Sequence, residues 1–357
     1  MTSAPNVLLL GGGSVGAIAA WNLEANKQAA VTVVCRSNFP VLSRNGYRIE
    51  SCDHGTIQGY KPTGVLDKVP DDEIGYGSRI WDYVVCATKN VADVPPGVHE
   101  LIRPAVTPGR TVVVLVQNGL NIEKHLFATF SQNVILSGVS LIGAKEPEPG
   151  RIVQDFPDKI FVRPFRNPNL DPEVEKAAAE RFVEIYGAGG KTRCTYRADV
   201  SWTRWRKLVY NACLNPICAL TGLATGRIRL ADGAIAGLVR PAMAEIVAAA
   251  KASGYDLPET VVHDMIEMDP LDMYLPPSML SNVRKGNMIE YENILGEALR
   301  EGEKLGVAMP TLRVLYHLCQ GVQWKNKELK GLVVVPPKGS FWAEGVTPLR
   351  GFFVSVG

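Results

Sequence analysis

The stretch Asn6-Val-Leu-Leu-Leu-Gly-Gly-Gly-Ser-Val-Gly16 decides the fold of this chain. Its apolar run predicts a short strand, and its glycines predict a tight turn. Apolar residues recur from Ala17 to Leu23, so a helix is expected to follow. The glycines form a G-x-G-x-x-G pattern. In this context, glycine lets the backbone approach a pyrophosphate, which rests on the amides and the positive dipole end of the helix.

A second apolar run makes this pattern more specific than a lone match. It extends from Ala30 to Cys35, at the distance expected for a strand, helix, strand unit. The sequence therefore predicts a dinucleotide-binding domain. The residues expected to contact the cofactor are Gly11, Gly13, Ser14, Val15 and Gly16.

The end of the second strand bears on the choice of cofactor. NAD-binding proteins usually place Asp or Glu there to hold the ribose 2′-hydroxyl, whereas this chain has Cys35-Arg36-Ser37-Asn38. A guanidinium and a hydroxyl supply donors to a 2′-phosphate, so Arg36 predicts NADPH. The alternative interpretation is a surface arginine in a loop.

Two further apolar runs each end in polar residues. They extend from Tyr83 to Lys89 and from Thr111 to Gly119, and they are typical of parallel strands buried on both faces. Ligands bind outside the carboxyl ends of such strands, so Lys89 and Asn118 are predicted near the nicotinamide half of the cofactor. A simple Asn-Gly turn is the alternative for Asn118.

The rest of the chain changes from mixed to helical character. Shorter strands and turns, including Glu146–Gly150, are expected between Val134 and Tyr196, with a helix from Pro172 to Tyr186. The predicted architecture is an α/β Rossmann-type domain followed by an all-helical domain, with the active site between them. We expect domains at 1–197 and 198–324 and an extension at 325–357. The later helices are expected at 200–221, 234–252, 258–267, 279–284, 290–305 and from there to about 323.

A polar stripe follows the domain junction in Lys207-Leu-Val-Tyr-Asn211-Ala-Cys-Leu-Asn215-Pro216. Residues four apart stack along one face of a helix, so Lys207, Asn211 and Asn215 are expected side by side. Their neighbours are apolar, and a polar stripe on a packed helix must find partners or line a cleft. The alternative is a solvated face.

Ser278 and Glu290 are further candidates in the helical part. A glutamate that opens a helix is stabilised by the helix dipole, so Glu290 is equally compatible with an ordinary first-turn carboxylate. Spacing alone does not separate the two interpretations.

Composition excludes several classes of function. The 357 residues include 38 basic and 36 acidic side chains, which gives a formal charge of +2 and no electrostatic reason to expect nucleic acid or a membrane surface as a partner. The seven cysteines and five histidines are scattered, so neither disulfides nor a metal site is predicted. No apolar run has the length of a membrane span, and no secretion signal opens the chain. We expect a cytosolic protein that is a monomer or a homodimer.

Six ordered pieces of the sequence together resemble the ketopantoate reductase (2-dehydropantoate 2-reductase) family, over about residues 6 to 324. They are Gly11-x-Gly13-x-x-Gly16, Arg36, Lys89, Gln117-Asn118-Gly119, Lys207-x3-Asn211-x3-Asn215-Pro216, and Ser278-Met-Leu with Glu290.

The resemblance implies NADPH-dependent reduction of the 2-keto group of ketopantoate to (R)-pantoate, a step toward coenzyme A. It also implies roles for individual residues. Lys207 would be the general acid, and Glu290 would order its surroundings. Asn211, Asn215 and Ser278 would hold a 2-oxo acid substrate, and Asn118 would lie where nicotinamide meets substrate.

Three departures from the family pattern leave other substrates open. Met288-Ile-Glu-Tyr-Glu292 stands where the family commonly has Thr-Glu-Ile-Asp, an inserted-looking segment spans Gly64 to Ser78, and the tail after Gln323 is long. A reductase of another small 2-oxo acid or ketone, of the D-2-hydroxy-acid dehydrogenase type, is therefore an alternative. A non-catalytic NADPH sensor is another, although a sensor would have no need of the lysine and amide stripe.

Overall fold

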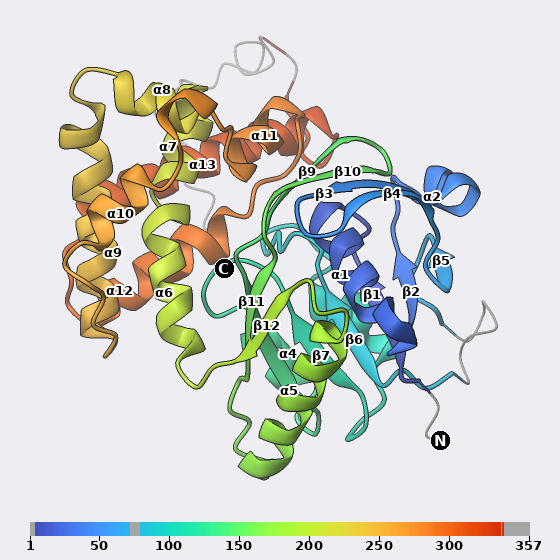
Figure 1. Cartoon of the computed structure of the whole chain (residues 1–357). Coiled ribbons are helices and arrows are strands. Elements are labelled where there is room, and N and C mark those ends of the chain that lie inside the picture. The colour runs from blue at the N-terminus through green and yellow to red at the C-terminus, as the bar shows by residue number, and fades with distance from the viewer. Residues whose placement is uncertain (1–3, 72–78, 337, 339–357) are drawn as a thin grey trace.

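The computed structural model describes residues 4–71, 79–336 and 338. Figure 1 shows a sheet-containing N-terminal part beside a helical C-terminal part. The larger sheet has eight strands in the order β12-β11-β8-β7-β6-β1-β2-β5. Its strands are β1 (Asn6–Leu10), β2 (Ala30–Val34), β5 (Gly64–Leu66), β6 (Tyr83–Cys86), β7 (Val112–Leu115), β8 (Ile135–Ser140), β11 (Lys159–Pro164) and β12 (Arg193–Tyr196).

The central strands of this sheet are parallel, as the apolar runs predict. Strand β1 pairs with β2 and β6 in parallel, and only β11 pairs with its neighbour β8 in antiparallel fashion. Side chains of β1 alternate between two cores, because Val7 and Leu9 belong to one cluster and Leu8 and Leu10 to the other. This burial on both faces explains why the strand is continuously apolar.

Helices cover both faces of the sheet. One face packs on α1 (Ser14–Glu24) and α5 (Pro172–Gly187), which contribute Ile18 and Phe182 to its core. Leu126 of α4 lies in the core of the other face. The short elements in this part are η1 (Ala25–Lys27), α2 (Phe39–Asn45), α3 (Val98–Ile102), η3 (Arg103–Ala105) and α4 (Lys124–Thr129).

A second sheet of four strands, in the order β4-β3-β10-β9, was not expected from the sequence. It consists of β3 (Tyr47–Ser51), β4 (Gly55–Tyr60), β9 (Gly143–Glu148) and β10 (Arg151–Phe156). The expectation of turns across Glu146–Gly150 is wrong, because β9 continues to Glu148 and only the next two residues turn. Strands β9 and β10 pack against α1, so this hairpin lies close to the glycine loop.

The helical part has its own core. Its elements are α6 (Val200–Asn211), α7 (Leu214–Thr221), α8 (Thr225–Leu230), η4 (Ile235–Val239), α9 (Arg240–Ala252), α10 (Val261–Glu267), η5 (Leu271–Met273), α11 (Ser278–Arg284), η6 (Glu292–Gly296), α12 (Glu297–Lys304) and α13 (Pro310–Leu329). Val209, Ile217 and Leu295 are among the apolar residues buried between them. The α/β plus all-helical architecture is thus confirmed.

The continuous helix expected over residues 200–221 is wrong. Helix α6 ends at Asn211 and α7 begins at Leu214. Pro216 explains the break, because it has no amide hydrogen to donate to the carbonyl of Ala212, four residues earlier. Proline is tolerated in the first turn of a new helix, which is where Pro216 lies.

The last helix is longer than expected. Helix α13 continues to Leu329, so the first residues of the proposed 325–357 extension belong to it. Residues 337 and 339–357 of that extension, and residues 72–78 of the inserted-looking segment, lie outside the described residues. The described start of the inserted-looking segment, Gly64–Leu66, is the edge strand beside β2.

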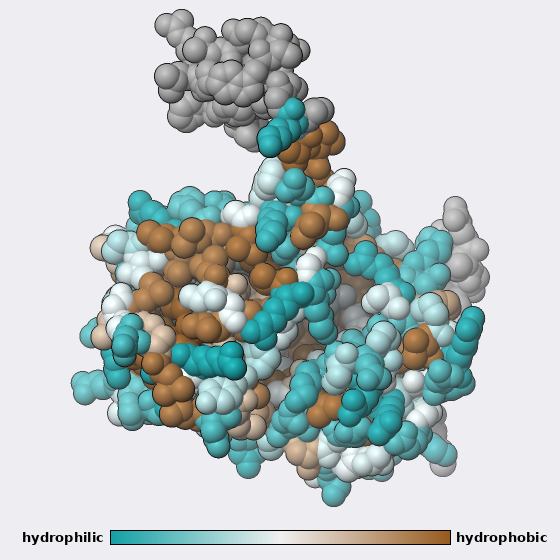
Figure 2. All heavy atoms as spheres, turned by 90° about the horizontal axis from the view of Figure 1, so that it is seen from above, coloured by the Kyte–Doolittle hydropathy of each residue, from teal (hydrophilic) through white to brown (hydrophobic). Residues whose placement is uncertain are grey.

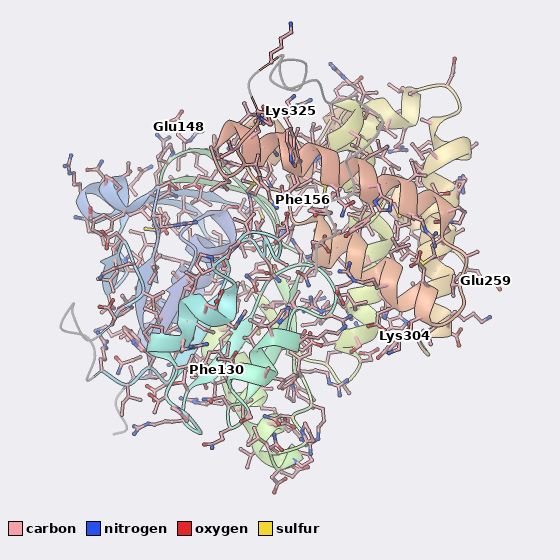
Figure 3. All side chains as sticks on the ribbon, turned by 180° about the vertical axis from the view of Figure 1, so that it is seen from behind. Phe130, Glu148, Phe156, Glu259, Lys304 and Lys325 are labelled. Carbon is pink, nitrogen blue, oxygen red and sulfur yellow. The ribbon has the colours of Figure 1, made fainter. Side chains whose placement is uncertain are left out.

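Large apolar side chains are exposed on the helical part. Figure 2 shows apolar side chains gathered over the helical part, where the exposed large apolar residues include Leu230, Met268 and Leu271. Figure 3 labels Glu148 on the sheet-containing part, far from Glu259 and Lys304 on the helical part.

None of the described helices is long and apolar enough to cross a membrane.

Candidate active site

The glycine loop has the backbone that its sequence predicts. Gly11 has φ +104°, and its amide donates to the carbonyl of Val34 on the neighbouring strand. A Cβ on Gly16 would fall on the carbonyl oxygen of Gly11, well inside contact distance. Side chains are therefore excluded at both positions, by conformation at Gly11 and by close approach at Gly16.

The loop has room for a pyrophosphate. A Cβ on Gly13 would meet only Glu146 Oε2, at 3.9 Å, within 4 Å. The amides of Ser14, Val15 and Gly16 lie in the first turn of α1, where amides have no acceptor within the helix, and no acidic residue occupies that turn. The Ser14 hydroxyl donates to the carbonyl of Ala144 on β9. These residues fit a dinucleotide, held by backbone amides more than by side chains.

Arg36 and Ser37 are exposed just after β2. The side chain of Arg36 has no hydrogen bond or ion pair with any residue of the described ranges, so its guanidinium is available to a 2′-phosphate. The following residue, Asn38, is buried, and its amide donates to the carbonyl of Gly12 at 3.2 Å and to Glu146 Oε1 at 2.5 Å. Asn38 thus ties the end of β2 to the glycine loop.

Glu146 was missed in the sequence because it lies in the stretch that was interpreted as turns. Its carboxylate accepts from Asn38 and from the amide of Gly150, and it faces Gly13. Burial raises the pKa of Glu146, while Asn38, Lys285 and Lys89 oppose that rise. A buried carboxyl with a raised pKa thus lies beside the loop that is expected to hold the pyrophosphate.

Lys207 lies at the seam between the two parts. Its ammonium donates to Asn118 Oδ1 and to the carbonyl oxygen of Ser140, both at 2.6 Å. Asn118 follows β7 and Ser140 ends β8, so the lysine of the helical part reaches the carboxyl ends of two central strands. Lys207 and Asn118 line one cavity together with Gln117, Gly119, Arg204 and Asn211.

The surroundings of Lys207 make it a stronger acid than an ordinary lysine. Burial lowers the pKa of its ammonium to about 8, the charge of Arg204 acts in the same direction, and Glu290 opposes both. With this pKa, most of the Lys207 population carries its proton at neutral pH. The group can therefore donate a proton near physiological pH.

Glu290 is buried and holds a loop of the sheet-containing part. Its Oε1 accepts from the amide of Asn90, which follows Lys89, at 2.8 Å. Burial raises the pKa of Glu290, while the Asn90 amide, Lys89 and Lys207 favour the carboxylate. Glu290 thus contributes negative potential near Lys207 and fixes the loop after β6.

Two asparagines add further contacts between the sheet-containing part and the helical part. Asn90 donates to Asn293, whose own amide donates to the carbonyl of Leu120 at 3.0 Å. The amide of Leu120 donates back to the carbonyl of Asn293 at 2.7 Å. Gly119 permits this approach, because it has φ +101° and a Cβ there would lie 2.5 Å from the Asn293 carbonyl oxygen. Asn90 and Asn293 were missed in the sequence, where an isolated asparagine carries no signal.

The structure brings only some of the remaining candidate residues to the cavity that Lys207 lines. Asn211 ends α6 and lines the cavity with Lys207, whereas Asn215 lies beyond the helix break and is buried. The stripe is therefore not one continuous helical face. Ser278 opens α11, which packs against α7, but it is exposed and its hydroxyl makes no hydrogen bond with the described part of the chain. Lys89 is exposed after β6, and its ammonium donates to Asn282 Oδ1.

No group of three or more His, Cys, Asp or Glu side chains within 4–71, 79–336 and 338 has the arrangement of a metal site.

Arg204, a buried guanidinium one turn before Lys207, was also missed as a site residue. The sequence showed it only as part of a short basic run.

Family models match both parts of the chain. The model described as ketopantoate reductase PanE/ApbA matches residues 7–167, and the model of the ketopantoate reductase PanE/ApbA C terminal matches residues 199–323. The chain belongs to the ketopantoate reductase family. Ketopantoate reductases are oxidoreductases that act on a CH–OH group, and the family uses NADPH.

Relatives match over nearly the whole chain. The uncharacterized protein YDL144C of Saccharomyces cerevisiae is 34% identical over 92% of this chain and 96% of its own length. A 2-dehydropantoate 2-reductase of Nostoc sp. is 22% identical over 89% and 95%. The similarity therefore extends over both the sheet-containing part and the helical part.

Solved structures agree with this architecture. The 2-dehydropantoate 2-reductase of Geobacter metallireducens has a TM-score of 0.75 at 26% identity, covering 88% of this chain and 99% of that one. The enzyme of Methylococcus capsulatus has a TM-score of 0.72 at 28% identity, covering 90% and 97%. A D-mandelate dehydrogenase solved with NADH and anilino(oxo)acetate shares the fold, with a TM-score of 0.74 at 16% identity over 90% of this chain and 99% of that one.

Proposed function

We propose that this ketopantoate reductase family member reduces 2-dehydropantoate to (R)-pantoate with NADPH and that Lys207 is its general acid. The observation that carries the proposal is the contact of the Lys207 ammonium with Asn118, 2.6 Å away. Gln117, the neighbour of Asn118, donates to Thr88, whose amide lies against Gly11 of the glycine loop, and this supports a proton donor close to the cofactor. Relatives named 2-dehydropantoate 2-reductase support the same activity.

The reduction needs a hydride and a proton. NADPH, held by the glycine loop and Arg36, would supply the hydride for the carbonyl carbon of the substrate. Lys207 stabilises the negative charge that develops on the carbonyl oxygen and donates its proton to that oxygen, which leaves a neutral amine. A pKa of about 8 suits this role, because the ammonium is protonated before the reaction and releases its proton readily.

The neutral polar groups would hold the substrate. Asn211, Asn215 and Ser278 are proposed to bind the carboxylate and hydroxyl of a 2-oxo acid, and Asn118 to contact both nicotinamide and substrate. Amides and hydroxyls can do this without competing as acids. Glu290 is proposed to act through Lys207, by favouring its charged form and by holding the Asn90 loop.

A substrate panel tests the proposal. Purified protein is assayed with NADPH and ketopantoate, with other small 2-oxo acids, and with matched ketones that lack the carboxylate. We expect ketopantoate to have the highest kcat/KM, and the ketones to be poor, because donors aimed at the carboxylate would be left unpaired. A simple ketone reduced as efficiently as ketopantoate would contradict the proposal.

A second candidate is reduction of another small 2-oxo acid. The fold shared with a D-mandelate dehydrogenase favours it, since that structure was solved with anilino(oxo)acetate and NADH. The same panel separates the two candidates by the order of kcat/KM. Complete absence of NADPH oxidation with every 2-oxo acid, together with tight NADPH binding, would instead indicate the sensor. Location in the cytosol, the three-part domain division and a monomeric or homodimeric state remain predictions.

A further inference from the structure

Helix α6 carries a second cation one turn before the proposed acid. Arg204 is 5% exposed, and its guanidinium donates to three groups of the sheet-containing part. Nη1 donates to the carbonyl oxygens of Gln117 at 3.2 Å and Gly119 at 2.6 Å, and Nη2 donates to the Ser137 hydroxyl at 2.7 Å. Arg204 therefore crosses the same seam as Lys207.

Arg204 and Lys207 contact the same loop and the same strand of the sheet-containing part. Arg204 bonds the residues on either side of Asn118, while Lys207 bonds the Asn118 side chain. On β8, Arg204 bonds Ser137 and Lys207 bonds the carbonyl of Ser140. Residues three apart on a helix are neighbours. Consecutive turns of α6 therefore hold the same loop, residues 117–119, and the same strand, β8.

Stability alone does not account for this arrangement. Arg204 forms no ion pair with a carboxylate of the described ranges, its Nε has no hydrogen-bond partner there, and its guanidinium carbon lies 5.7 Å from the centre of the Phe165 ring. Burial lowers the pKa of Arg204 to about 10, and only Glu123 opposes this, so the guanidinium is still charged at neutral pH. A buried cation without a paired carboxylate is costly to the fold.

We propose that Arg204 is a positioning residue of the reduction, which fixes the loop of residues 117–119 for the substrate and prepares Lys207 to release its proton. The proposal rests on the proposed role of Lys207 as the acid. The guanidinium of Arg204 is engaged with protein groups through Nη1 and Nη2. It acts through the loop that carries Asn118 and through its positive charge beside the Lys207 ammonium.

The charges around Lys207 agree with this role. Burial and then Arg204 lower the pKa of Lys207, and Glu290 raises it. These are the charged groups that face Lys207, Arg204 from its own helix and Glu290 from the segment before η6. Removing the charge of Arg204 removes a repulsion, so the Lys207 ammonium then holds its proton to higher pH.

The test compares Arg204→Met and Arg204→Lys with Arg206→Met. Arg206 is a matched control, because it lies on the same helix, is half-buried, and its side chain has no hydrogen bond or ion pair within the described residues. The readouts are the pH profile of kcat, NADPH binding, and the pH dependence of acylation of Lys207 by acetic anhydride, measured by mass spectrometry. The acylation readout needs no turnover, so it still tests Arg204 if the protein does not reduce ketopantoate.

We expect Arg204→Met to lower kcat at least about tenfold, because the loop loses its buried donors. The acylation midpoint and the alkaline limb of kcat should both move up by roughly one pH unit, as expected for neighbouring charges on one helix. Arg204→Lys should leave the midpoint in place but lower kcat, since an ammonium lacks the fork that reaches the three acceptors. Arg206→Met should match the wild type.

An Arg204→Met midpoint equal to that of Arg206→Met would overturn the proposal, and so would an equal kcat in the two variants. A loss of thermal stability without either change would assign Arg204 a purely structural role. If Arg204→Met did not fold, Arg204→Lys would decide. A lower kcat with an unshifted midpoint would support the proposal, and a kcat equal to that of the control would overturn it.

Discussion

Replacement of Gly119 by alanine should break the seam between the two parts of the molecule. The added Cβ would lie 2.5 Å from the carbonyl oxygen of Asn293, so the loop must retreat by roughly 1 Å to reach an ordinary contact. That movement would stretch the 2.7 Å bond from the Leu120 amide to Asn293 beyond hydrogen-bonding range. It would also displace Asn118, the neighbour of Gly119 and the partner of Lys207.

The cost can be divided into two contributions. Alanine at a positive φ costs about 1–2 kcal/mol, and loss of a buried hydrogen bond costs about 1–3 kcal/mol. Gly119→Ala should therefore lower the free energy of unfolding by roughly 2–5 kcal/mol. Gly222→Ala is the matched control, since Gly222 has φ +74° with nothing within 4 Å of an added Cβ, so only the first cost applies.

Thermal or chemical denaturation of both variants, together with kcat, checks this prediction. Gly119→Ala should be the less stable variant and should lose most of its kcat, whereas Gly222→Ala should keep it. Equal stability of the two variants would refute the reasoning about the contact between Gly119 and Asn293.

Three further predictions concern the cofactor and stability. Arg36→Ala should raise the KM for NADPH at least about tenfold and leave NADH nearly unaffected, because a charged hydrogen bond to phosphate is lost; equal use of both cofactors by the unmutated protein would contradict this. Glu146→Gln should tighten NADPH binding at alkaline pH and flatten its pH dependence, measured by fluorescence titration, whereas Glu148→Gln, at an exposed site on the same strand, should change neither. Burial raises the pKa of Asp158 from 3.8 to about 6, so this carboxyl stabilises the fold at acid pH and loses that contribution as pH rises through 6. Relative to the wild type, Asp158→Asn should gain at most ~3 kcal/mol in unfolding free energy between about pH 4 and 7, and an unchanged pH dependence in chemical denaturation would argue against it.

The sequence predicts those features whose physics is local. The continuous apolar run of β1 and the glycines that follow it fix a buried parallel strand and a loop without side chains. Lys89 and Asn118 follow parallel strands and Lys207 follows the domain junction, so all three are predicted where the two parts meet. The predictions of the strand and the glycine loop hold because period and turn chemistry act over short stretches.

Other features depend on distant partners. Strand β9 was missed because its exposed polar residues and prolines resemble a turn until it pairs with β10. The break after α6 was missed because residues 200–221 were expected to form one helix, whereas Pro216 lies in the first turn of a second one. Arg204 looks like a surface cation in the sequence, and only the fold shows that it is buried against the carbonyls of the Gln117–Gly119 loop.

The pH dependence of kcat in the wild type and in Lys207→Met tests the central claim most directly. Methionine keeps the apolar stem and removes the ammonium, while the glycine loop and Arg36 are elsewhere, so NADPH binding should survive. The wild type should lose activity with an apparent pKa near 8, as Lys207 loses its proton. Lys207→Met should lose roughly 10²–10⁴-fold in kcat and show no such limb. A folded Lys207→Met protein that binds NADPH and keeps a near-normal kcat would contradict the account, because another group would then be the acid.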